Sequence, residues 1–392
     1  MDPIQNIQFD NSLLATIIDH VGQISSQINQ NSRREPFHSL RHQLIFEEDR
    51  RATRGIIALS TKGCTYAKRF GPCTICGHLG SCIWDTDISD EGVLKLFHKS
   101  LAQVRIYRPE TLCIYCSGSF CDDFEVSKQV RSEILRVLAN EDWIHNVIFE
   151  SLPQFITQET AKDIAEHLLH KVVMIGVGLD CSTQPMRSIL TFKRIPNGAY
   201  KTAAKVCRNV GILPIAYVVV KPPFLTEGES VWEAAEAIHK ASQFGYKHIS
   251  LEPLALQHGT LQSLLWLLKL YDRPTIWTIL DSILFWRKRY SLEYKSLTLH
   301  IGGEIFTPEP YLTYAMCKSC ESAALPALRS LGVNFRGRPL QEQRDTCCNR
   351  GHILISKPSM SDLIDRIKNA EISIRNRDTE QKRGPDYACP AI

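Results

Sequence analysis

Short β-branched runs recur along the middle of this chain and alternate with helix-like segments. The runs are GIIALS at 55–60, TLCIYC at 111–116, NVIFE at 146–150, VVMIGV at 172–177, ILPIAYVVV at 212–220 and HISL at 248–251. Segments with one apolar face, such as 125–139 and 230–244, lie between them. Strands that alternate with helices form parallel βαβ units. The pattern predicts an α/β fold built as a partial (β/α)6 barrel of the TIM type, with ligands bound where the strands end.

The flanks of this region predict three further parts. Apolar residues spaced by three and four between Leu13 and Ile28 indicate a helical extension within residues 1–50, ahead of a barrel over 51–295. A strand-like run at 296–301 and four cysteines follow, so we expect a small cysteine-bearing module over 296–374. The charged segment 375–392 is predicted to be a flexible tail.

The composition excludes several classes of protein. The chain has 392 residues, 44% hydrophobic and 22% charged, which excludes a disulfide miniprotein, a coiled coil, a collagen and a wholly disordered chain. Its longest apolar stretch, 211–220, is about half of the ~20 residues that a membrane span needs, and no signal peptide is visible in the first residues. We therefore expect a cytoplasmic protein with no membrane partner. The net charge of +4 is compatible with RNA but does not argue for it.

The chain contains 14 cysteines, and their clustering carries chemical information. In a cytosolic chain, clustered cysteines bind metal or take part in redox chemistry. Cys64, Cys73 and Cys76 lie in TKGCTYAKRFGPCTIC, directly after the first strand-like run. Structural zinc takes four protein ligands, whereas a 4Fe-4S cluster on three cysteines keeps one iron open for a chelating molecule such as S-adenosylmethionine. A zinc site completed by Cys82, His78 or a distant cysteine is the alternative.

A second cysteine group lies outside the predicted barrel. Cys317 and Cys320 form a CxxC motif, and Cys347 and Cys348 follow 26 residues later, with His352 nearby. Such a set can supply a closed zinc site that stabilises a small module. A second iron–sulfur cluster and reduced structural thiols are the alternatives.

Six separated motifs together resemble one known family. They are KGC…CTIC at 62–76, SGSFCDDFEV at 117–126, FESLPQF at 149–155, GVGLDCS at 176–182, AYVVVKPPFLTE at 216–227 and QHGT at 257–260. This order and spacing resemble the radical S-adenosylmethionine (radical SAM) enzymes of the branch that includes the Elongator catalytic subunit, most closely those of archaeosine formation. The resemblance implies a cluster on Cys64, Cys73 and Cys76 and an electron donor such as flavodoxin or ferredoxin. It also implies cleavage of S-adenosylmethionine to a 5′-deoxyadenosyl radical, which abstracts hydrogen from the substrate inside a mostly apolar barrel.

The strand ends supply candidate contacts to S-adenosylmethionine. The turn Ser117–Gly118–Ser119 resembles the turn that binds the amino group in this family. Glu150 ends the third strand, and Asp180 stands where the family has Glu. Arg187 or Lys193 could pair with the methionine carboxylate, and a solvated helix charge is the alternative for each.

Lys221, Glu252 and His258 are the candidate substrate contacts, with a structural role as the alternative for His258. The sequence identifies no catalytic residue. Relatives carry Arg and an acid where this chain has Leu152 and Gln154, so the substrate can differ from the family's.

Three functions stay open at the level of sequence. The resemblance implies a radical SAM enzyme acting on a modified 7-deazaguanine nucleoside in tRNA, with a partner enzyme that supplies the substrate. The same chemistry on a small metabolite or natural product is the second. A non-catalytic iron–sulfur or zinc-binding protein is the third.

Overall fold

The computed structural model describes residues 54–77, 88–257, 259–290, 296–302 and 353–381, with residue 15 and three short strands between 38 and 52. The elements in chain order are β1 (His38–Leu40), β2 (Ile45–Glu47), β3 (Arg50–Ala52), β4 (Arg54–Ala58), α2 (Thr65–Phe70), α3 (Asp90–Arg105), β5 (Thr111–Tyr115), α4 (Lys128–Ala139), β6 (Asn146–Glu150), η3 (Pro153–Phe155), α5 (Gln158–His167), β7 (Val172–Asp180), α6 (Gln184–Leu190), α7 (Asn197–Asn209), β8 (Leu213–Val220), α8 (Glu227–Phe244), β9 (His248–Pro253), α9 (Leu261–Leu267), α10 (Ile276–Arg289), β10 (Thr298–Ile301) and α13 (Met360–Gln381).

One sheet organises this part of the molecule. Its strand order is β1-β4-β5-β6-β7-β8-β9-β10, and the strands from β4 to β10 all pair in parallel. β1 pairs antiparallel with β4 and forms one edge, while β10 forms the other. Since the edges do not pair with each other, the sheet is an open, partial barrel. The predicted α/β partial barrel is confirmed, and all six predicted strands are present.

The sheet extends further than the sequence pattern indicated. β10 pairs in parallel with β9, with Leu299 opposite Ile249, so the sheet continues past the predicted barrel end at residue 295. α13 likewise runs to Gln381, beyond the predicted start of the tail at residue 375. Of the predicted helix between residues 13 and 28 only residue 15 is described, and residues 303–352 of the module predicted over 296–374 lie outside the described residues.

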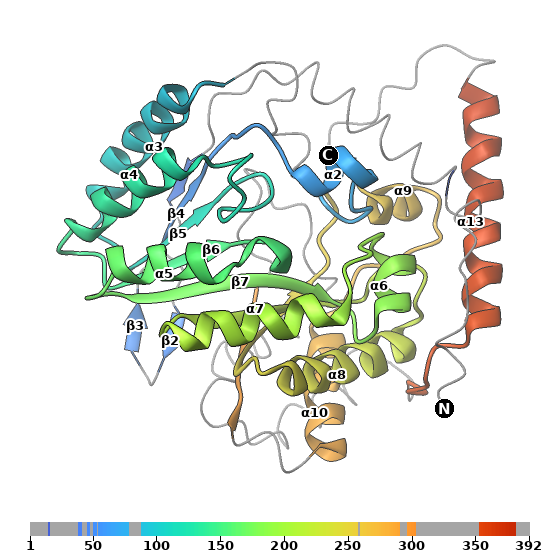
Figure 1. The fold of residues 1–392 in the computed structure, drawn as a ribbon. Coiled ribbons are helices and arrows are strands. Elements are labelled where there is room, and N and C mark those ends of the chain that lie inside the picture. The colour runs from blue at the N-terminus through green and yellow to red at the C-terminus, as the bar shows by residue number, and fades with distance from the viewer. Residues whose placement is uncertain are drawn as a thin grey trace.

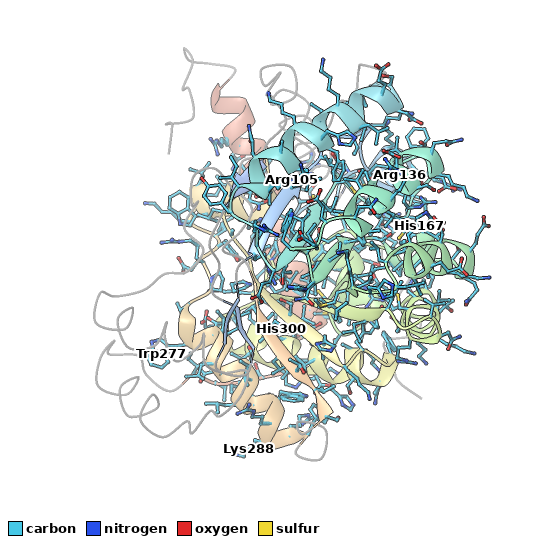
Figure 2. The ribbon with its side chains drawn as sticks, turned by 90° about the vertical axis from the view of Figure 1, so that its left-hand side faces the viewer. Arg105, Arg136, His167, Trp277, Lys288 and His300 are labelled. Atoms are coloured by element: carbon cyan, nitrogen blue, oxygen red, sulfur yellow. The ribbon has the colours of Figure 1, made fainter. Side chains whose placement is uncertain are left out.

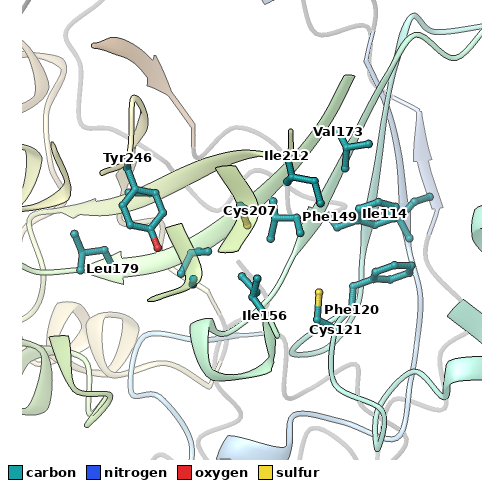
Figure 3. Packing of buried hydrophobic residues seen from close by; sticks show 14 of the residues in the cluster. Ile114, Phe120, Cys121, Phe149, Ile156, Val173, Leu179, Cys207, Ile212 and Tyr246 are labelled. Atoms are coloured by element: carbon teal, nitrogen blue, oxygen red, sulfur yellow. The ribbon is translucent and has the colours of Figure 1, made fainter. Parts of the chain in front are cut away.

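Outward-facing residues of the strands pack against the helices and form the main core. Figure 1 shows α3, α4, α5, α7 and α8 along one face of the sheet. Ile114, Phe149, Val173 and Leu179 alternate with inward-facing residues along their strands and are fully or almost fully buried (Figure 3). Phe120 stacks on Phe149 with ring centroids 4.1 Å apart. Burying each such side chain contributes about 1.5–3 kcal/mol.

A second apolar cluster holds α13 against the barrel. Leu363, Ile367, Ala370 and Ile374 are almost fully buried, and their spacing of four, three and four places them on one helix face. They belong to the same cluster as Leu265 of α9. The last described helix therefore packs beside the carboxyl ends of the strands, where α9 and α6 also lie (Figure 1).

Candidate functional site

The segment 64–77, which we call the cysteine loop, follows β4 and is tied to two other strand-end segments. Thr74 N–H donates to the carbonyl of Thr191 (3.2 Å), and the Thr74 carbonyl accepts from Leu261 N–H (2.7 Å). Gly77 N–H donates to the side chain of Gln257 (3.0 Å). These bonds join the loop to the end of α6 and to the segment between β9 and α9, which hold it at the carboxyl end of the sheet. Figure 1 shows α2, α6 and α9 together at this end of the sheet.

The three cysteines of this loop are reduced thiols and partly accessible. Burial raises the pKa of Cys73, and the nearby Cys76 and Cys64 raise it further, while Lys193 lowers it. Cys64 and Cys76 therefore both lie near Cys73. In the described residues, no three His, Cys, Asp or Glu side chains converge as a single metal ion requires. A 4Fe-4S cluster does not need that convergence, because each thiolate binds its own iron. The donor set fits such a cluster better than zinc.

The turn Ser117–Gly118–Ser119 lies against the cysteine loop. A Cβ added at Gly118 would be 2.7 Å from Cys64 Cβ and 2.8 Å from Cys64 Cα, so only glycine allows this approach. The Ser117 hydroxyl is buried and has no hydrogen-bond partner among the described residues. The Ser119 hydroxyl instead accepts from Leu152 N–H (3.0 Å) and ties the turn to the end of β6. Of the two serine hydroxyls of this turn, that of Ser117 can therefore form a hydrogen bond with a ligand.

Glu125 holds this turn in place, and the sequence analysis did not single it out. Its buried carboxylate accepts from Gly118 N–H (2.7 Å), Ser119 N–H (2.6 Å) and the Thr61 hydroxyl (2.5 Å). Burial raises the pKa of Glu125, while these hydrogen bonds lower it, with a net increase. Asp122 and Asp123 stand beside it in the same motif, so sequence carried no signal that marks Glu125.

Asp180 and Lys193 form a buried ion pair beside the cysteine loop. Lys193 Nζ is 2.7 Å from the Asp180 carboxylate and donates to the Gly178 carbonyl at 3.2 Å. Burial alone would lower the pKa of Lys193, but Asp180 and Cys73 raise it on balance. An ammonium has three N–H donors, so one remains for a third acceptor. Lys193 is therefore a charged group that can still meet a carboxylate.

Arg187 does not share this position, although the sequence treated the two cations alike. Its guanidinium is fully buried and donates to the carbonyls of Cys181 (3.1 Å) and Ile195 (3.2 Å) and to Asn197 Oδ1 (2.5 Å). It also lies 4.7 Å over the ring of Tyr200. These bonds give Arg187 a structural role in joining α6 to the start of α7.

The inner face of the sheet carries an apolar cluster and a polar cluster. The apolar cluster agrees with the predicted interior and comprises Ile56, Cys113, Tyr115, Ile148, Met174 and Ile215. The polar cluster was not predicted. Glu150, Tyr217, Glu252 and Arg54 point from β6, β8, β9 and β4 onto this face, and all are partly accessible. Burial raises the pKa of Glu150 to about 8; Tyr217, which donates to the carboxylate, lowers it and Glu252 raises it. The sequence did not indicate the polar cluster, because side chains alternate between the two faces of a strand and the apolar residues dominate each run.

The far edge of the inner face is also polar. Glu252 lies so close to Gly302, which follows β10, that a side chain there would overlap its carboxylate. Figure 2 labels His300, which belongs to β10. A ring nitrogen of His300 lies 3.4 Å from a ring nitrogen of His248 on β9. Burial, together with the nearby His248 and Arg54, lowers the pKa of His300 to about 4. His300 is therefore neutral near pH 7.

Lys221 lies directly after β8, at the carboxyl end of the sheet, so its predicted contact with a substrate at the barrel mouth stays a prediction. Lys221 Nζ pairs with Glu227 at 2.7 Å and lies 5.9 Å from the ring of Tyr271. It lines a cavity of about 760 Å³ that also involves Trp266 of α9 and Arg366 of α13. Lys221 has a positive φ (59°) directly after β8.

Five predicted site residues lie outside the described residues. They are His258, Cys317, Cys320, Cys347 and Cys348. Within the described part of the chain, no helix combines the length and the apolar character needed to cross a membrane.

Sequence comparison relates this chain to named archaeal proteins, although no family model matches it. It is 29% identical over 229 residues to an uncharacterized protein of Methanocaldococcus jannaschii, covering 57% of this chain and 62% of that protein. It is 26% identical over 278 residues to archaeosine synthase subunit beta of Methanosarcina acetivorans, covering 71% and 78%. The same subunit of Thermococcus kodakarensis is 27% identical over 235 residues, covering 59% and 71%. This chain is thus similar in sequence to two archaeosine synthase beta subunits. The resemblance predicted from its motifs is thereby confirmed.

Solved structures give weaker matches. Methylornithine synthase is 10% identical, with a TM-score of 0.44, covering 74% of this chain and 73% of that one. Coproporphyrinogen III oxidase from Escherichia coli, a radical SAM enzyme, is 10% identical with a TM-score of 0.40, covering 64% and 63%.

Proposed function

We propose that this chain is a radical SAM enzyme whose cysteine loop holds a 4Fe-4S cluster on Cys64, Cys73 and Cys76. The observation that carries the proposal is the meeting of three partly accessible thiols with the close approach of Gly118 to Cys64. The kinship with archaeosine synthase beta subunits supports the same assignment. When bound, the cluster supplies the electron that cleaves S-adenosylmethionine into methionine and a 5′-deoxyadenosyl radical.

Residues around the loop would orient the methionine part of S-adenosylmethionine. Glu125 already accepts the N–H groups of Gly118 and Ser119, so this turn offers the cofactor ammonium the Ser117 hydroxyl and backbone carbonyls. Lys193 would place its remaining N–H on the methionine carboxylate, with Asp180 fixing its position. The lysine acts as a point charge beside a low-dielectric wall, where an ion pair is stronger than in water.

We assign the inner face of the sheet to the substrate. Glu150 and Glu252 are carboxyl groups that face each other across Tyr217, so this face suits a substrate rich in N–H donors or carrying a cation. A modified 7-deazaguanine nucleoside in tRNA has this character, and the names of the relatives support it. A partner enzyme would make the modified base, and flavodoxin or ferredoxin would donate the electron.

One experiment tests the radical chemistry and the cysteine assignment together. The wild-type chain, reconstituted with iron and sulfide without oxygen, is expected to form 5′-deoxyadenosine from S-adenosylmethionine and dithionite. The triple Cys64→Ala, Cys73→Ala, Cys76→Ala variant is expected to bind no cluster, whereas Cys207→Ala, in the buried core, keeps it. Wild-type protein with a full cluster and no 5′-deoxyadenosine would refute the enzyme proposal. Iron retained by the triple variant would refute the cysteine assignment.

Two parts of the proposal have separate tests. Dependence of product formation on tRNA separates an RNA substrate from a small metabolite or natural product, which the apolar Leu152 would also suit. For Cys317, Cys320, Cys347 and Cys348 we propose structural zinc, tested by metal analysis of the purified full chain and of a variant with all four replaced by Ser. Absence of zinc that those substitutions remove would refute it.

A further inference from the structure

The rim of the cysteine loop carries exposed aromatic rings next to cations. Phe70, at the end of α2, is 49% exposed, and Phe124, in the turn before α4, is 52% exposed. Lys68 Nζ lies 4.7 Å from the centroid of the Phe124 ring, and Arg69 lies 5.1 Å from that of Phe70. Large exposed rings cost free energy unless something covers them, so this pairing suggests a ligand.

Tyr66 connects this surface to a further cation. Its ring lies 5.1 Å from that of Phe70, and its hydroxyl accepts from Arg194 N–H at 2.8 Å. The same hydroxyl donates to the carbonyl of Phe192 at 3.1 Å, and the Arg194 guanidinium lies 4.4 Å over the Phe192 ring. The row of contacts therefore runs from Phe124 across α2 to Arg194, and we call it the α2 rim.

The α2 rim is positive because acids are missing from its sequence neighbourhood. α2 contains Lys68 and Arg69 and no acid in its first turn. From Cys181 to Thr226 the chain has no Asp or Glu but seven Lys and Arg residues, including Arg194. Of the nearby acids, Asp122 accepts from the Thr65 hydroxyl and Asp123 pairs with Arg131 at 2.8 Å.

We infer that the α2 rim is a docking surface for an unpaired stretch of the RNA substrate, with bases on Phe70 and Phe124 and phosphates on Lys68, Arg69 and Arg194. Aromatic platforms flanked by cations bind single-stranded nucleic acid because every base has a π-face and every linkage a charge. An acidic protein would meet the cations but leave the rings without stacking partners. This inference rests on the proposed function, because α2 begins directly after Cys64 and RNA docked here would lie beside the cluster.

The test measures binding of a fluorescently labelled tRNA transcript to the full chain by anisotropy, without any turnover. Phe70→Ala combined with Phe124→Ala is expected to weaken binding at least tenfold, from a stacking contribution of about fivefold or more per base. Arg69→Ala and Arg194→Ala should each lower the salt dependence of binding by about one counterion. Iron content and thermal unfolding report whether each variant is folded.

Matched controls lie at the opposite end of the barrel. Tyr107→Ala removes a ring that is 50% exposed before β5, and Lys205→Ala removes an exposed cation of α7. Neither should change the affinity by more than about twofold. Phe124→Ala alone serves if the double variant unfolds, because the Phe124 ring is exposed and its contact is with Lys68.

The outcomes separate this inference from the proposed function. Wild-type protein that forms 5′-deoxyadenosine but does not bind the transcript would overturn the docking surface and leave the enzyme proposal intact. Equal affinity of wild type and the Phe124→Ala variant would also overturn it. A fully paired RNA duplex, whose bases cannot stack on the rings, should bind at least tenfold more weakly than an unpaired strand of equal length. Equal binding of both would overturn the stacking role.

Discussion

Replacing Gly118 with alanine should displace the cysteine loop. The added Cβ would lie 2.7 Å from Cys64 Cβ, 2.8 Å from Cys64 Cα and 2.7 Å from the Glu125 carboxylate. Cys64 Cα belongs to the backbone, so relief requires movement of the loop itself rather than of a side chain. Overpacking of this kind costs about 1–3 kcal/mol, which is roughly a five- to hundredfold shift toward a displaced loop. Gly118 has no positive φ, so the cost is steric.

The assay is cluster loading followed by unfolding. We expect the Gly118→Ala variant, reconstituted without oxygen, to bind less iron per chain and to unfold at lower denaturant concentration than wild type. Gly198→Ala is the matched control, because a Cβ there meets nothing within 4 Å and the site lies in the first turn of α7. That change should stabilise the chain by about 0.5–1 kcal/mol. Full iron content in Gly118→Ala with unchanged stability would refute the close approach of the two segments.

Three further substitutions test single groups. Glu125→Gln places a donor against backbone N–H groups and should lower the free energy of unfolding by about 1–3 kcal/mol in denaturant titrations; no loss would refute its anchoring role. Glu150 has a pKa of about 8 in the folded chain, which is above its pKa in the unfolded chain. Between these two pKa values the folded state binds more protons than the unfolded state. The folded state therefore loses stability as the pH rises from 5 to 8. Glu150→Gln should therefore gain in melting temperature relative to wild type over that window, and parallel profiles would contradict it. Asp180→Asn leaves Lys193 buried without its partner and should lower the free energy of unfolding by about 3–5 kcal/mol. The control Glu166→Gln removes an exposed ion pair and should lower it by less than ~1 kcal/mol. Equal losses in the two variants would contradict the buried pair.

The strands and the cysteine loop were predictable because their signals are local. Each buried strand is a run of β-branched residues. A buried parallel strand can be recognised from such a run alone, without knowing which strands pair with it. The thiols at 64, 73 and 76 follow the first run directly, so a loop at the strand ends was the expected place for them. The sequence indicated a strand at β10 but not its pairing with β9, because that pairing involves residues some 50 positions earlier in the chain.

The division of roles between Arg187 and Lys193 could not be read from sequence. Both are cations that follow β7 within a short stretch. Arg187 lies inside α6, where its side chain points into the core and meets three acceptors. Lys193 comes after the helix ends, and the left-handed conformations of Asp180 (φ 62°) and Phe192 (φ 56°) turn it back toward the strand end. Arg187 and Lys193 therefore differ in role because the backbone directs the first into the core and the second toward the site.

The polar cluster of the inner face depends on two glycines of β7, because they leave room for the side chains around them. Gly176 and Gly178 face inward on β7, and a Cβ at Gly176 would overlap the Tyr217 hydroxyl that donates to Glu150. A Cβ at Gly178 would lie 2.7 Å from Lys193 Nζ. The GVG stretch of β7 thus makes room for a tyrosine from one side and a lysine from the other. Because β7 lies between β6 and β8 in the sheet, any larger residue at either glycine would separate the carboxyl group of Glu150 from Tyr217 or Lys193 from the strand. The same strand therefore builds the core with its valines and opens the site with its glycines.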